Sequence, residues 1–95
     1  MTPLTWAALL NPNPDVITAL LKDGADVKAR GENGVTALIL AAGGTQNPEV
    51  VSALLKAGAD AKVKDKSRKT ALDYAQRNAN LKGTGALRKL EEASK

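Results

Sequence analysis

The chain is 95 residues long and has no apolar run approaching the roughly 20 residues of a membrane-spanning helix. It contains neither cysteine nor histidine, which excludes disulfides, thiolate and imidazole metal sites, cysteine nucleophiles and histidine-dependent catalytic triads. Only Trp6 and Tyr74 are aromatic, so we expect a core of alanine, leucine and valine arranged in thin, regularly stacked layers. No basic region precedes the short apolar stretch at 5–10, so we expect no secretory signal and a cytoplasmic location.

Basic charge is concentrated in the last third of the chain, although the net charge is only +4. Residues 1–60 carry four basic and six acidic side chains, or −2, whereas residues 61–95 carry ten and four, or +6. This asymmetry is compatible with a solvated basic surface, an acidic partner or nucleic acid.

A repeat of 34 residues organises the sequence, and 15 of 34 positions are identical between residues 2–35 and 36–69. A fixed period of this length is typical of a stacked repeat array. The matching segments are Thr2-Pro3-Leu4, Thr36-Ala37-Leu38 and Thr70-Ala71-Leu72, followed by Asn13-Pro14-Asp15-Val16 with Asn47-Pro48-Glu49-Val50, and Ala19-Leu20-Leu21-Lys22 with Ala53-Leu54-Leu55-Lys56.

Each unit is predicted to begin with a helix of about eight residues. Thr2, Thr36 and Thr70 are suitable N-caps, and Thr70 with Asp73 forms a capping-box pattern. Small alanine pairs follow in the first two units, so neighbouring helices of this type can approach closely. The glycines at 43–44 and 83–85 lack the context of a phosphate-binding loop and are interpreted as helix ends or loops.

A second helix is predicted after Asn13 and Asn47, each followed by proline and an acidic residue in the first turn. Its apolar residues form one stripe, and a lysine followed by Gly24 or Gly58 marks its end. An extended finger follows at 27–35 and 61–69, and Asn33-Gly34 is typical of a tight turn. We expect Asp26 and Asp60 to form local hydrogen bonds at the base of each finger.

The third unit departs from the pattern after Tyr74. Leu81, Leu87 and Leu90 can line a helix, but charged residues surround them. A terminal unit with one polar side is what an array needs in order to stop stacking.

On these residues the chain resembles the ankyrin repeat family, most clearly from Thr36-Ala37-Leu38 through Leu54-Leu55-Lys56-Ala57-Gly58-Ala59-Asp60. The resemblance implies an all-α, ankyrin-type helix-turn-helix solenoid of about three repeats with projecting hairpin fingers. It implies a single domain over 1–95, with repeat 1 at about 1–30, repeat 2 at about 31–64 and a C-terminal capping repeat at about 65–95.

The sequence also departs from the family pattern. The unit has one extra residue, and the histidine that often follows Thr-Pro-Leu is replaced by Thr5, Ile39 and Asp73. The fingertip glycine, kept at Gly34, becomes Arg68 in the second finger. Because a left-handed backbone is costly for arginine, we expect that fingertip to be looser or differently turned.

The resemblance further implies that partners dock on the concave strip formed by the fingers and the exposed side of the first helices. Val35 and Ile39 are either an apolar anchor on this strip or packing at the finger base. The matching positions are Arg30, Glu32, Asn33, Val35, Ile39, Gly43 and Gly44 around the first finger, and Lys64, Lys66, Ser67, Lys69, Asp73, Arg77 and Asn78 around the second.

We therefore predict a non-catalytic protein–protein interaction module without metal or cofactor, whose partner is an acidic or mixed protein; an engineered scaffold without a natural partner is included in this class. The alternative is a nucleic-acid or anionic-surface binder that uses the basic C-terminal third. Two aromatic residues are few for base stacking, and Glu32, Asp65 and Asp73 interrupt the basic strip.

The N-terminal face leaves three alternatives open, because the first unit carries no polar substitutions on its stacking side. The chain is cut from a longer array, or two copies associate there, or Trp6 folds down as a cap. The residues expected to form this apolar patch are Leu4, Trp6, Leu9, Leu10, Val16 and Ile17.

Overall fold

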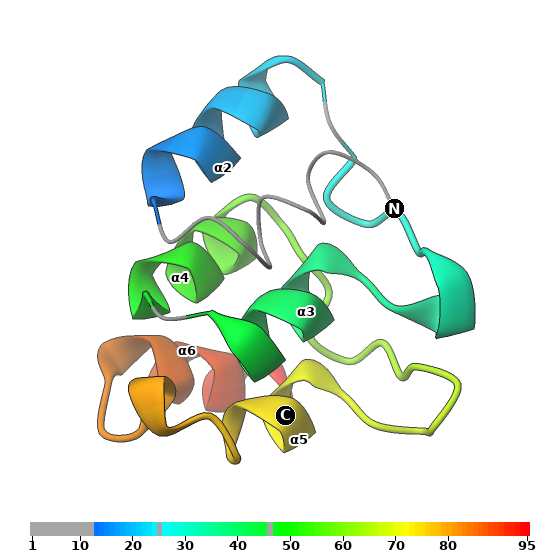
Figure 1. Cartoon of the computed structure of the whole chain (residues 1–95), viewed down its shortest axis with the longest axis vertical. Coiled ribbons are helices and arrows are strands. Elements are labelled where there is room, and N and C mark those ends of the chain that lie inside the picture. The colour runs from blue at the N-terminus through cyan, green and yellow to red at the C-terminus, as the bar shows by residue number, and fades with distance from the viewer. Residues whose placement is uncertain (1–12, 25, 46) are drawn as a thin grey trace.

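The computed structural model describes residues 13–24, 26–45 and 47–95, and these residues form helices and connecting turns without a β-strand (Figure 1). In chain order the elements are α2 (Pro14–Lys22), the 3-10 turn η1 (Glu32–Gly34), α3 (Ala37–Gly44), α4 (Pro48–Lys56), α5 (Ala71–Ala75), the 3-10 turn η2 (Ala79–Leu81) and α6 (Gly85–Ala93).

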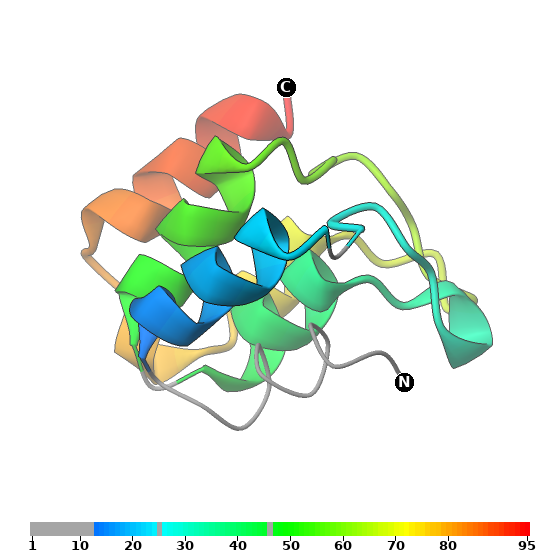
Figure 2. The ribbon, with the colours of Figure 1, turned by 90° about the horizontal axis from the view of Figure 1, so that it is seen from above.

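The helices lie in stacked layers that follow the sequence repeat. Helices α2, α4 and α6 form one column, and α3 and α5 form a second column beside it (Figure 1). The segments at 27–35 and 61–69 project from the layers toward the same side (Figure 2). We call them the first and second finger. The all-α architecture expected from the sequence is therefore confirmed, although the fingers are made of turns.

Local sequence signals fix where the helices begin. The side chains of Asn13 and Asn47 accept hydrogen bonds from the N–H groups two residues on, at 2.9 and 3.0 Å. Thr36 and Thr70 cap α3 and α5, and Thr70 with Asp73 completes the predicted capping box. These contacts satisfy N–H groups that have no partner inside a helix.

Glycine at the end of the second helix of a unit is required by the backbone. Gly24 and Gly58 follow α2 and α4 with φ of 96° and 99°, in the left-handed region that other residues rarely adopt. The predicted helix stops are thus confirmed.

Small and branched apolar side chains form the core. Ala41, Ala42 and Ala75 are fully buried, which shows that the alanine positions bring α3 and α5 close together. The larger buried side chains that join the layers are Ile17, Leu38, Val50, Val51, Leu54, Leu81 and Leu90.

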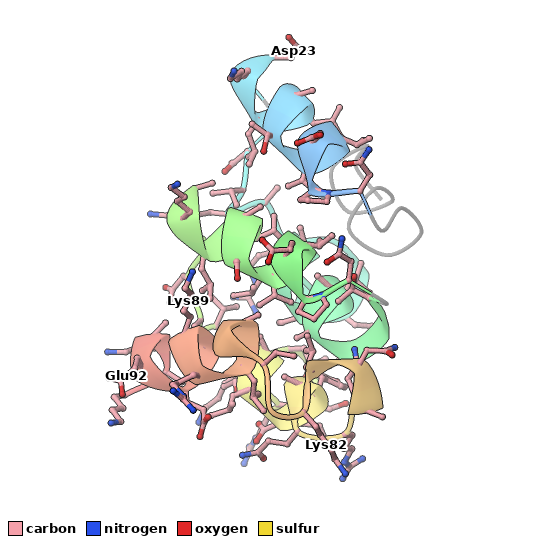
Figure 3. All side chains as sticks on the ribbon, turned by 90° about the vertical axis from the view of Figure 1, so that its left-hand side faces the viewer. Asp23, Lys82, Lys89 and Glu92 are labelled. Carbon is pink, nitrogen blue, oxygen red and sulfur yellow. The ribbon has the colours of Figure 1, made fainter. Side chains whose placement is uncertain are left out.

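The last layer is apolar inside and charged outside. Leu81 and Leu90 are buried and Leu87 is half-buried, whereas Lys82 and Glu92 extend from the outer surface and Lys89 lies on the side toward α4 (Figure 3). This is the polar termination that the sequence predicted.

The apolar patch predicted on the N-terminal side falls mostly outside the described residues, which is the case for Leu4, Trp6, Leu9 and Leu10. Val16 is half-buried and Ile17 is fully buried. Ile17 is thus a core residue and no part of an open patch, which corrects the expectation for that position.

Candidate finger and helix surface

The two fingertips close with an equivalent hydrogen bond but differ in the turn that it spans. In the first finger the Gly31 N–H donates to the Val35 carbonyl at 2.7 Å, and in the second the Asp65 N–H donates to the Lys69 carbonyl at 3.0 Å. Arg68 adopts φ of 63°, close to the 72° of Gly34. The first turn also has Asn33 in the left-handed region, at φ of 62°, whereas Arg68 is the one left-handed residue of the second turn, so the second fingertip is differently turned, as expected.

The side chain of Asp65 explains why arginine is held in this conformation. Its Oδ1 accepts hydrogen bonds from the N–H groups of Ser67 at 2.8 Å and Lys69 at 3.1 Å, which flank Arg68 on both sides. The first fingertip has glycine at the equivalent position 31 and instead places two residues, Asn33 and Gly34, in the left-handed region. A side-chain carboxylate thus replaces the conformational freedom of glycine.

Tyr74 of α5 in turn holds Asp65, because its hydroxyl donates a hydrogen bond to Asp65 Oδ2. This hydrogen bond lowers the pKa of Asp65 from its usual value; burial opposes the shift, and the N–H groups of Lys69 and Ser67 assist it. The same bond raises the pKa of Tyr74, and burial acts in the same direction. The second finger is therefore fixed to the first helix of the unit that follows it.

The fingers are also fixed to each other. Arg30 Nη2 donates to the Lys64 carbonyl at 2.6 Å and its Nε to the Gly34 carbonyl at 3.3 Å. The Lys66 N–H donates to the Asn33 carbonyl at 2.7 Å. These bonds make the two fingers one continuous surface. At the finger bases, the carboxylates of Asp26 and Asp60 accept the N–H groups of Lys28 and Lys62 at 2.8 Å, as predicted.

Positive charge on the second finger is not neutralised by ion pairs. Within the described part of the chain, the one ion pair joins Lys95 to Glu92, far from the fingers in sequence. The nearby carboxylates of Asp65 and Asp73 are engaged with main-chain N–H groups. Lys64, Lys66 and Arg68 are exposed and thus available to an anionic ligand.

An open hollow lies beside this charge, on the side of α3 and α5. It is almost entirely apolar, and the Tyr74 ring forms one wall, with Lys69 Nζ 5.8 Å from the ring centroid. Its lining residues are Val35, Ile39, Leu40, Gly43, Gly44 and Tyr74. Leu40 and Tyr74 were not among the site residues predicted from the sequence. A signal for them exists, because Trp6, Leu40 and Tyr74 are large side chains at the same position of the 34-residue period.

The remaining residues selected from the sequence divide into exposed and structural ones. Asn33, Ser67 and Arg77 are exposed, and Glu32 lies in η1. Ile39 is only 5% exposed, and Asp73 caps α5.

Asn78 is 8% exposed and uses its side chain inside the protein. Its Nδ2 donates to the carbonyls of Ala42 at 3.1 Å and Thr45 at 3.0 Å, in the preceding layer. It is therefore an internal link between repeats, which the repeat alignment alone placed on the surface.

In the described residues, no group of three or more acidic side chains is arranged to hold a metal ion. None of the helices described there is long and apolar enough to cross a membrane.

The model of the family described as ankyrin repeats (3 copies) matches residues 4–93. This match covers nearly the whole chain, so the protein belongs to the ankyrin repeat family. Repeats of this family are generally protein–protein interaction modules. Comparison with curated proteins gives no significant match.

Proposed function

We propose that this ankyrin repeat protein is a non-catalytic module that binds an acidic or mixed protein partner through its fingers and the adjoining side of α3 and α5. The observation that carries the proposal is the second finger: its cations lack ion pairs, and its backbone is held in place by Asp65 and Tyr74. A cytoplasmic location belongs to the same proposal.

Rigidity supports the proposal because a surface ordered before binding loses less conformational entropy when a partner docks. The bonds from Arg30 and Lys66 hold one finger against the other. Unpaired cations on such a frame increase the rate of encounter with an acidic partner.

Charge reversal tests the surface against a matched control. The finger variant carries Lys64→Glu, Lys66→Glu and Lys69→Glu; the control carries Lys82→Glu, Arg88→Glu and Lys89→Glu on the last layer and has the same net charge. Five of the six side chains are exposed and Lys69 is half-buried, and such charges contribute about 0–1 kcal/mol each, so we expect both variants to keep the parent's circular dichroism melt within a few degrees.

Affinity capture from cell extract, quantified by mass spectrometry, is then compared for parent, finger variant and control. Partners should be retained by the parent and the control and lost by the finger variant. Equal retention by all three proteins would place the interaction elsewhere.

A salt series with random-sequence DNA distinguishes the alternative of nucleic-acid binding. Affinity for DNA that falls steeply with salt, and that both charge-reversed variants reduce, would favour the alternative.

A further inference from the structure

The hollow on α3 exists because the middle repeat has glycine where the other repeats have large side chains. Positions 43 and 44 correspond, one period away, to Leu9 and Leu10 in the first unit and to Arg77 and Asn78 in the third. The pair of glycines is therefore specific to the middle unit, where it lines the hollow together with Leu40 and Tyr74.

The backbone does not require glycine at position 43. Gly43 lies within α3 and is not among the residues with positive φ, unlike Gly24, Gly34 and Gly58. A Cβ added there would meet Tyr74 Cβ at 3.4 Å, which is close to ordinary contact. Because glycine inside a helix lowers stability relative to alanine, the gain here lies in the close approach of Tyr74 to α3 and in the open space beside its ring.

Cations stand at the edge of this apolar space. Lys69 Nζ lies 5.8 Å from the centroid of the Tyr74 ring, and Arg77 is near enough to lower the pKa of Tyr74 in opposition to Asp65. Lys66 continues the charge along the second finger. The Tyr74 hydroxyl is already bonded to Asp65, so the ring presents an apolar wall to a ligand.

From this arrangement we infer that the surface recognises a short acidic segment of the partner that carries one apolar anchor of leucine or phenylalanine size. The anchor fills the hollow over Gly43, and carboxylates beside it in sequence contact Lys69 and Lys66. This inference rests on the proposed function and adds the chemistry of the recognised segment. An extended peptide advances about 3.3 Å per residue, so acids one to three residues from the anchor lie about 3–10 Å away from it, a span that long lysine side chains can cover.

Fluorescence anisotropy with labelled twelve-residue peptides tests the inference. The probes carry a central leucine flanked by three glutamates, on the N-terminal side in one peptide and on the C-terminal side in another. In one control serine replaces the leucine, and in a second glutamine replaces the glutamates. Of the two peptides that carry both leucine and glutamates, the one that binds more tightly should exceed each of its controls in affinity by about tenfold or more. This is the effect expected from burying one aliphatic side chain or from pairing the charges.

Gly43→Leu supplies the decisive variant because it fills the hollow while improving helix propensity. We expect it to melt no lower than the parent, yet to lose about tenfold in affinity for the anchored acidic peptide. Gly43→Ala should lose less. Ala93→Leu, at an exposed position of α6, is the matched control and should bind as the parent does.

The outcomes separate the inference from the proposed function. Equal binding of peptides with and without leucine, unchanged binding by Gly43→Leu, or no binding of either anchored peptide would overturn the inference. If acidic peptides bind regardless of the anchor and the finger charge reversal abolishes that binding, the proposed function stands without the hollow. A finger variant that captures every partner of the parent would instead overturn the proposed function.

Discussion

Replacing Asn78 should weaken the contact between repeats, and lower the free energy of unfolding, more than the substitution of an exposed residue near the fingers. Its Nδ2 is the donor for two carbonyls at the end of α3, at 3.1 and 3.0 Å, and its Oδ1 accepts the N–H of Asn80 at 3.0 Å. Asn78→Ala leaves the buried acceptors without this donor, which costs about 1–3 kcal/mol, and removes an N-cap worth about 0.5–2 kcal/mol.

The loss is large relative to the stability of such a domain. At about 0.05–0.15 kcal/mol per residue, a chain of this size has roughly 5–14 kcal/mol in total. A loss of about 2–4 kcal/mol lowers the melting temperature by on the order of 10–25 °C. Circular dichroism melts and urea titrations measure both quantities.

Asn78→Asp sharpens the experiment because it keeps the shape and the cap while removing the donor. A carboxylate facing two carbonyls in a buried position has a raised pKa in the folded state. The free energy of unfolding of the Asn78→Asp variant, relative to that of the parent, is therefore highest below about pH 4 and falls as pH rises through the folded-state pKa.

Asn80→Ala is the control, since its Nδ2 reaches the Thr45 carbonyl only at 3.5 Å and the residue is exposed. If Asn78→Ala and Asn80→Ala destabilise equally, or Asn78→Asp follows the parent at every pH, the assigned link between layers is incorrect.

Three further predictions concern the core, a helix end and the second finger. Leu54→Ala, at a side chain with 0% exposure, should cost about 2–5 kcal/mol in a urea titration; a cost like that of an exposed substitution would contradict its place in the core. Gly58→Ala should cost about 1–2 kcal/mol although nothing lies within 4 Å of the added Cβ, because φ of 99° alone opposes it; an unchanged melt would show that this helix end relaxes. Asp65 has a lowered pKa when folded, so its contribution to stability is present above about pH 4 and is lost as pH falls through the folded-state pKa. Tyr74→Phe removes the largest cause of that shift, and the loss of stability between pH 5 and 2 should become shallower than in the parent; identical pH profiles would mean that the bond does not persist in solution.

Local signals in the sequence predicted the helices well. Thr36, Asn47 and Thr70 act within three residues of their own position, so composition and spacing alone identify them. The 34-residue period placed the helices in layers because equivalent apolar stripes must cover one another.

Contacts between layers could not be predicted from these local signals. Asn78 follows the repeat alignment onto the binding strip, yet its side chain reaches carbonyls 33 and 36 residues earlier. Asp65 looked like an interruption of a basic strip, whereas it holds the left-handed Arg68 in place. Both roles depend on main-chain groups brought near by folding, which a pattern of side-chain types does not contain.

Tyr74 both helps to fix the position of the second finger and forms one wall of the hollow. Its hydroxyl holds Asp65, which fixes the backbone that carries Lys66 and Arg68, while its ring forms the apolar wall opposite Gly43. A ligand that fills the hollow packs on the same ring whose hydroxyl restrains the finger. Because the finger is already fixed relative to this ring, the acidic residues of a ligand anchored in the hollow meet the lysines without further ordering of the finger. In this chain the large residue of the terminal repeat gives the fingers a fixed position relative to the hollow, which a leucine at position 74 could not do.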